Sequence, residues 1–210
     1  MTNTQYARLT LGLILAWFVL SVSASALHLL RSGSAAPPLA LGLAALSPLV
    51  IFAIWCAASP GFRSFVLSLN PQTLTIVQSW RIVGYALIVA SAYRLLPGPF
   101  AQSAGWGDVF IGLTAPFVAL RLANPEHKTA FVIWNWLGIA DLVNAVALGS
   151  MSAFLDPHGI SAAAMSVLPF SVIPAFGVPL LAILHIISLA RARRWRPDRI
   201  VEKQLAFSKS

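Results

Sequence analysis

The chain has 210 residues, of which 58% are apolar and only 10% are charged, and its formal net charge is +8. Ordinary soluble domains have roughly 45–50% apolar and about 25% charged residues, so this composition excludes a water-soluble globular domain. Long apolar runs recur from end to end. They predict an integral membrane protein whose main partner is the lipid bilayer.

Six apolar segments follow one another, each near the roughly twenty residues that a helix needs to cross a hydrocarbon core of about 30 Å. Glycine and proline clusters separate them and indicate short connections. We therefore predict an all-α, polytopic bundle of about six transmembrane helices, with one domain over residues 1–190 and a basic tail over 191–210. The predicted spans are Leu9–Leu30, Leu39–Ala58, Gln72–Leu95, Gly107–Leu122, Thr129–Met151 and Leu168–Ala190.

The first segment also resembles a cleavable signal peptide. Arg8 precedes an apolar core, and small residues at Ala24 and Ala26 imitate a cleavage site. The apolar run continues through Leu29 and Leu30, which suits an uncleaved first span. The sequence leaves both interpretations open.

Basic residues predict the orientation. With six spans both termini share a side, where eleven basic residues then lie, against two on the other side. The positive-inside rule therefore predicts a multi-pass protein of the cytoplasmic membrane with both termini in the cytoplasm. The basic tail explains the positive net charge, so we infer no nucleic-acid partner from it. The tail is suited to contact anionic lipids. The eleven are Arg8, Arg63, Arg121, Lys128 and the seven basic residues of 191–210, and the two are Arg31 and Arg94.

Arg81 is the one arginine or lysine in the middle of a predicted span. It lies nine residues beyond Gln72, about 14 Å along the helix and therefore near the bilayer centre. An unpaired charge at that depth costs roughly 2.5–3.5 kcal/mol on insertion scales, so we expect a partner. Asp141 lies at a similar depth in the fifth span. We predict a bidentate ion pair between Arg81 and Asp141.

Polar neighbours extend this pair into a predicted network. On an α-helix, Gln78, Arg81 and Tyr85 share one face, as do Asp141 and Asn144. The network either holds two helices in register or binds a solute, a proton or a cofactor, and the sequence does not separate these roles. If it binds a ligand, we expect a cavity open to the outer face.

Polar residues are also predicted near the outer surface. They are His28 at the end of the first span, Asp108 at the start of the fourth, and His158 beside Asp156 in the loop before the sixth. Asp108 suits the N-terminal cap of a helix. These residues come from separate segments without the spacing of metal ligands, so we predict no metal site.

His185 lies in the predicted sixth span and is the candidate for a haem ligand, alone or with His127. A bond to a neighbouring group is its more ordinary role. No cofactor is otherwise indicated. The chain has no Gly-rich phosphate loop, zinc-binding helix motif or Gly-x-Ser-x-Gly turn, so the sequence assigns no catalytic residue.

Four stretches carry a resemblance to known proteins: "WRIVGYALI", "LPGPFAQSAGWGDVFIGLTAPFVA", "WNWLGIADLVNAVALGS" and "LPFSVIPAFGVPLLAILHIISL". Together they resemble a widespread group of small, uncharacterised bacterial membrane proteins, over roughly the last two thirds of the chain. The resemblance implies a bacterial inner-membrane setting and assigns no activity and no residue role.

Three functions are compatible with these features. The buried Arg81 and Asp141 favour a transporter or binder of a small solute, with or without a coupled proton. The same charges suit an accessory subunit in which they only hold helices together. Scattered histidines and tryptophans leave a redox protein of haem or quinone open. The sequence does not indicate the substrate or the oligomeric state.

Overall fold

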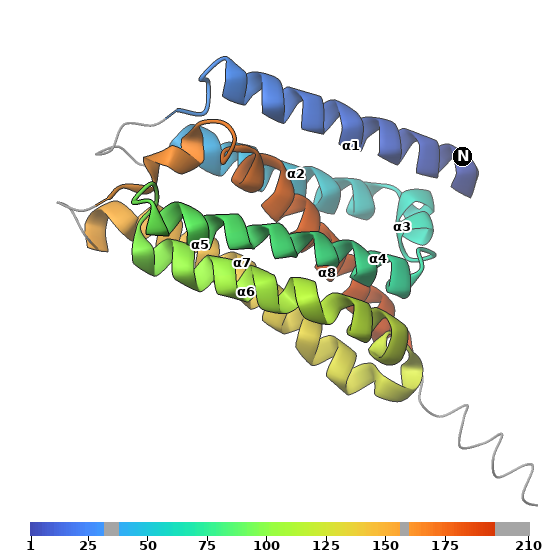
Figure 1. Cartoon of the computed structure of the whole chain (residues 1–210). Coiled ribbons are helices and arrows are strands. Elements are labelled where there is room, and N and C mark those ends of the chain that lie inside the picture. Colours follow the sequence, from blue (N-terminus) through green and yellow to red (C-terminus); the bar gives the residue numbers. More distant parts are fainter. Residues whose placement is uncertain (32–37, 156–159, 196–210) are drawn as a thin grey trace, which may run out of the picture.

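The computed structural model describes residues 1–31, 38–155 and 160–195, with the backbone alone for residues 153–155. Within these ranges six helices are long and apolar enough to cross a membrane, and no strand occurs. The predicted all-α bundle of about six spans is thus confirmed, and the protein is a multi-pass membrane protein. Figure 1 shows the spans side by side, with α1 at the edge of the bundle.

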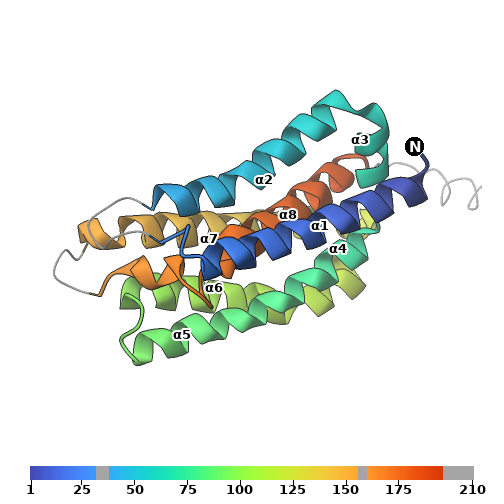
Figure 2. The same cartoon turned by 90° about the horizontal axis from the view of Figure 1, so that it is seen from above.

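The first two spans are α1 (Asn3–Ala26) and α2 (Leu39–Ala58). α1 begins at a capping box, in which the Thr2 side chain accepts from the Gln5 backbone N–H and the Gln5 side chain accepts from the Thr2 backbone N–H. A short helix, α3 (Pro60–Val66), follows α2 and is capped by Ser59. Figure 2 shows α3 at the end of the bundle near the N-terminus.

The third span, Pro71–Ala92, changes helix type along its length. It consists of α4 (Pro71–Val77), the 3₁₀ segment η1 (Gln78–Gly84) and α5 (Tyr85–Ala92). A 3₁₀ helix has 3.0 residues per turn, so its buried positions recur at every third residue. The buried residues of η1 follow that period: Gln78, Arg81 and Gly84.

The fourth span begins at Gly98, and the predicted start at Gly107 was wrong. α6 (Gly98–Phe117) continues as the π-helical turn η2 (Val118–Leu122). Its glycines and prolines imitate a loop, but Pro99 occupies the first turn, where a missing N–H costs no helical bond. Gly105 and Gly112 provide close packing instead of turns.

Close backbone packing joins α6 to η1. A Cβ atom at Gly112 would lie 2.5 Å from the backbone nitrogen of Ile82, and one at Gly105 would lie 3.0 Å from the carbonyl oxygen of Gly84. Neither backbone atom can move aside as a flexible side chain would. Small residues at these positions therefore bring the two main chains into direct contact.

The remaining chain forms the fifth and sixth spans. The fifth follows the short 3₁₀ turn η3 (Pro125–His127) and is α7 (Lys128–Leu155). After the 3₁₀ turn η4 (Ala162–Ser166), the sixth span begins at Ile173, later than the predicted Leu168. It consists of the π-helical η5 (Ile173–Gly177) and α8 (Val178–Arg193).

Proline in the sixth span explains how α1 is attached. Pro179 has no N–H, so the Ala175 carbonyl loses the donor that it would have four residues later in a helix. Trp17 Nε1 of α1 donates to this carbonyl oxygen at 3.1 Å, and Ser21 Oγ lies 3.5 Å from it. Two side chains of the first span thus contact the Ala175 carbonyl, whose usual α-helical donor would be the missing N–H of residue 179.

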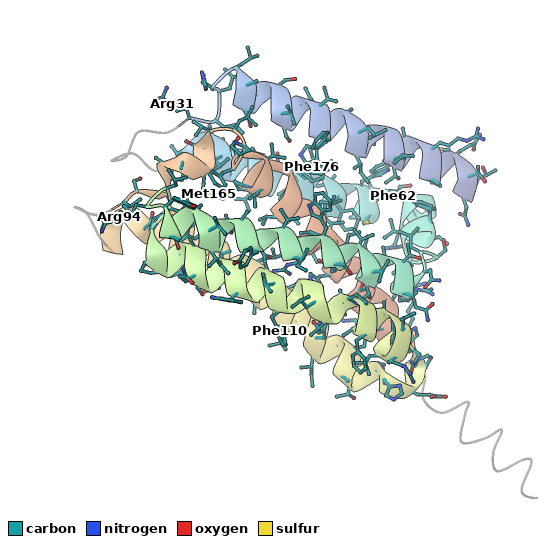
Figure 3. All side chains as sticks on the ribbon, in the orientation of Figure 1. Arg31, Phe62, Arg94, Phe110, Met165 and Phe176 are labelled. Carbon is teal, nitrogen blue, oxygen red and sulfur yellow. The ribbon has the colours of Figure 1, made fainter. Side chains whose placement is uncertain are left out.

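The bundle has two distinct ends. The terminal end carries the start of α1, α3 and the end of α8 (Figure 1). Arg31 and Arg94 lie at the opposite end, which we call the distal end (Figure 3). Both ends of the described chain therefore lie on the same side of the spans, as an even number of crossings requires.

This arrangement predicts the outcome of reporter fusions. A reporter after Ser210 of the full chain and one after Leu95 of a truncated chain should report opposite compartments, because the two points lie an odd number of spans apart. Periplasmic phosphatase activity and cytoplasmic fluorescence measure the two sides. The same compartment at both points would contradict the six-span topology.

Glycine substitutions test the packing of α6. Gly112→Ala should lower the free energy of unfolding by about 1–3 kcal/mol, because the new methyl group meets the η1 backbone. Gly42→Ala is the matched control, since nothing lies within 4 Å of the place that a Cβ atom would take there. It should be neutral or stabilise α2 by up to about 1 kcal/mol. Unfolding by dodecyl sulfate in mixed micelles measures both, and equal values would contradict the close contact.

Candidate functional site: a buried charge cluster

Arg81 lies at the meeting point of four spans. Its side chain is fully buried in η1, and its Nε donates to Asp108 Oδ1 of α6 at 2.6 Å. Nη2 donates to Asp141 Oδ2 of α7, so Arg81 and Asp141 form an ion pair as predicted. The predicted bidentate geometry was wrong, because Nε and Nη1 have other acceptors. Nη1 donates to the Gly138 carbonyl oxygen of α7 at 3.2 Å. One guanidinium thus binds two carboxylates and a backbone carbonyl.

His185 of α8 completes the site, and its hydrogen bonds define its protonation. Asn135 Nδ2 donates to the Phe131 carbonyl at 2.9 Å, so Asn135 Oδ1 is the acceptor for His185 Nδ1–H at 2.9 Å. His185 Nε2 lies 3.4 Å from Arg81 Nη1. Because a guanidinium only donates, Nε2 must accept, and the imidazole is neutral. We call Arg81, Asp108, Asp141 and His185 the charge cluster.

The charges within the cluster do not balance. Arg81 contributes one positive charge, while Asp108 and Asp141 contribute two negative charges when both are ionised. His185 is neutral by its hydrogen bonds. The side chains of Asp108 and Asp141 are 17% and 14% exposed, against 0% for Arg81. The carboxylates therefore border the surroundings of the bundle, whereas the guanidinium does not.

Three glycines make room for these side chains. A Cβ atom at Gly84 would collide with Asp108, one at Gly107 with Asp141 and one at Gly138 with His185. Each glycine lies on a different span from the side chain that it accommodates. The absence of three side chains thus permits both carboxylates and the imidazole to reach the helix interfaces around Arg81.

Asp108 does not occupy its predicted position. We expected a helix cap near the outer surface beside His28, but α6 begins at Gly98 and places Asp108 well inside the helix, on Arg81. His28 is exposed just beyond α1, with a φ of 58°. His158 and its neighbour Asp156 lie outside the described residues. The structure therefore does not bring Asp108 and His28 together.

The predicted network is only partly assembled. Gln78 is buried one 3₁₀ turn before Arg81, and its Nε2 donates to the Leu181 carbonyl at 3.1 Å. Tyr85 is 54% exposed, because four residues of 3₁₀ geometry rotate it by roughly 120° from Arg81 where an α-helix would give about 40°. Asn144 is exposed and donates to Ser103 Oγ at 2.8 Å. The polar path toward the outer face through Tyr85 is absent from the described structure.

His185 has the more ordinary of the two roles considered for it, a bond to neighbouring groups. Its side chain is fully buried, and both ring nitrogens contact protein groups, Arg81 at Nε2 and Asn135 at Nδ1. Both ring nitrogens are thus engaged by side chains of the third and fifth spans. Among the described residues no group of three or more histidine, cysteine, aspartate or glutamate side chains is arranged to hold a metal ion.

The fold and the site define a helical multi-pass membrane protein with a buried charge cluster. The chain belongs to the family described as a domain of unknown function, DUF8737, which matches residues 36–193. The matched range contains the whole charge cluster, and α1 precedes it. No curated protein and no solved structure matches the chain.

The unequal charges predict unequal effects of substitution. Arg81→Gln leaves two largely buried carboxylates without a cation and should lower the free energy of unfolding by about 3–5 kcal/mol. Asp108→Asn leaves a neutral pair of Arg81 and Asp141, and the amide oxygen can still accept from Nε, so the loss should stay below about 2 kcal/mol. Titration with dodecyl sulfate measures both variants.

A double variant provides the control. Combining Arg81→Gln with Asp141→Asn removes one charge of each sign and should be less destabilising than Arg81→Gln alone. If Asp108→Asn were as damaging as Arg81→Gln, the cluster would need both carboxylates as ions, and neither of them would be in excess.

Proposed function

We propose that the charge cluster binds and releases one proton within the bilayer, and that the protein is a proton-linked transporter or binder of a small solute. The observation that carries this proposal is the sharing of one guanidinium by two carboxylates beside a neutral histidine. With both carboxylates ionised, one negative charge has no counterpart in the cluster.

The bilayer makes that excess charge expensive. Moving an ion out of water costs several kcal/mol even after relaxation, and hydrocarbon offers no compensating dipoles. A proton on Asp108 or Asp141 leaves one ion pair and one neutral carboxylic acid. The protonated and deprotonated cluster then differ by one charge at the centre of the protein, which is the change that couples a proton to a rearrangement of helices.

The same geometry argues against an anionic ligand at Arg81. Four of its five N–H donors are directed at Asp108, Asp141, Gly138 and His185. An incoming anion would be repelled by the two carboxylates that already contact the guanidinium. A proton or a small monovalent cation matches the excess negative charge, and a proton needs no coordination sphere.

We further propose that the protein lies in a cytoplasmic membrane with its terminal end in the cytoplasm. Eleven basic residues belong to that side in the six-span topology, and Arg31 and Arg94 lie at the distal end. This distribution follows the positive-inside rule. The basic tail over 191–210 would then lie beside the anionic inner leaflet.

A structural role is the second candidate, and a specific observation favours it. Arg81 connects the third span to the fourth, fifth and sixth through side-chain contacts, as a helix-joining element would. In an accessory subunit of this kind, the protonation of the cluster would not change between pH values at which the protein is folded.

Infrared difference spectroscopy separates the two roles. Spectra of the wild-type protein in lipid, recorded between acidic and alkaline buffer, should contain the C=O stretch of a protonated carboxylic acid that disappears as the pH rises. Asp108→Asn and Asp141→Asn should each abolish it, because each variant leaves a balanced ion pair. Glu126→Gln, which removes an exposed carboxylate before α7, is the matched control and should leave the band unchanged.

The absence of the band would contradict the proposal. If the wild-type protein showed no such band at any pH at which it stays folded, the cluster would not exchange a proton. The structural role would then be favoured.

A further inference from the structure

Gln78 has a buried oxygen atom without a hydrogen-bond donor. The residue is 1% exposed, and its Nε2 donates to the Leu181 carbonyl, which fixes the orientation of the amide. Its Oε1 is buried and accepts no hydrogen bond from any described residue. A buried acceptor of this kind is normally satisfied by an ordered water molecule. Gln78 precedes Arg81 by one 3₁₀ turn, so this oxygen lies on the buried face that leads to the charge cluster.

Polar groups continue from Gln78 toward the terminal end of the bundle. Thr75 is 1% exposed and donates to the Pro71 carbonyl at 2.8 Å, which leaves its hydroxyl oxygen free to accept. On α8, which packs against α4, Ser188 is buried three residues beyond His185 in the same direction. Toward the distal end the buried face of the third span offers only Gly84, Leu87 and Ala90. The buried face of this span is therefore polar from Arg81 toward the terminal end and not toward the distal end.

We propose that a water molecule binds at Gln78 Oε1, and that protons reach the charge cluster from the terminal end along Thr75 and Gln78. This inference rests on the proposed function, because it needs a cluster that exchanges a proton. In the final step a hydronium at Gln78 transfers its proton to an ionised oxygen of Asp108 or Asp141. One O–H bond breaks, one forms, and a neutral water molecule stays at Gln78.

The exchange rate of the carboxylic proton tests this route. The wild-type protein in lipid is transferred rapidly into heavy water, and the shift of the carboxylic C=O band on deuteration is followed in time. Gln78→Met removes the acceptor at similar volume and should slow the exchange by about tenfold or more, as expected for the loss of one hydrogen bond on the route. Gln102→Met is the matched control, because Gln102 is exposed on α6 and bonds to Ser91.

A second variant keeps the route testable if the Gln78→Met protein does not fold. Thr75→Val keeps the shape of a buried side chain and removes the hydroxyl, and it should also slow the exchange while the amplitude of the band is retained. Wild-type exchange rates in a folded Gln78→Met or Thr75→Val protein would overturn the route. Failure of the proposed function looks different, since the wild-type spectrum would then contain no carboxylic band to follow.

Discussion

The structure depends on one constraint: a permanently charged guanidinium lies inside a bundle that the bilayer surrounds. Arginine cannot be neutralised by losing its proton, so the protein has to provide its counter-charges. It does so with Asp108 and Asp141, and it adds the Gly138 carbonyl and His185. These groups come from three other spans. The neutralisation of Arg81 is thus also the contact that fixes how the last four spans are arranged.

The geometry of the third span follows from this requirement. Its 3₁₀ segment aligns Gln78, Arg81 and Gly84 on one buried face and lets Asp108 pack against Gly84. The glycines that receive the carboxylates and the imidazole serve the same end. Binding one guanidinium with two carboxylates leaves an excess of one negative charge when both carboxylates are ionised. That excess distinguishes this cluster from a simple helix-joining ion pair and motivates a role in proton exchange.

The sequence predicted correctly those features that depend only on how deep a residue lies in the bilayer. Composition, the six apolar segments and the matched depths of Arg81 and Asp141 predicted the bundle and its central ion pair. The prediction failed where helix geometry departs from 3.6 residues per turn, as at Tyr85, and where glycines pack helices instead of ending them, as before Asp108. The true role of His185 depends on Asn135 and Phe131, two groups on another span, and no spacing in the sequence indicates their contact.

Counting protons on the aspartates tests the central claim most directly. The chain contains four aspartates, Asp108, Asp141, Asp156 and Asp198, so the protein labelled with ¹³C at the aspartate Cγ gives a spectrum that can be assigned residue by residue with Asp→Asn variants. Solid-state NMR of the protein in lipid bilayers at neutral pH should show one protonated carboxyl, and it should be lost in Asp108→Asn and in Asp141→Asn. Four ionised carboxylates in the wild-type protein would contradict a cluster that holds a proton.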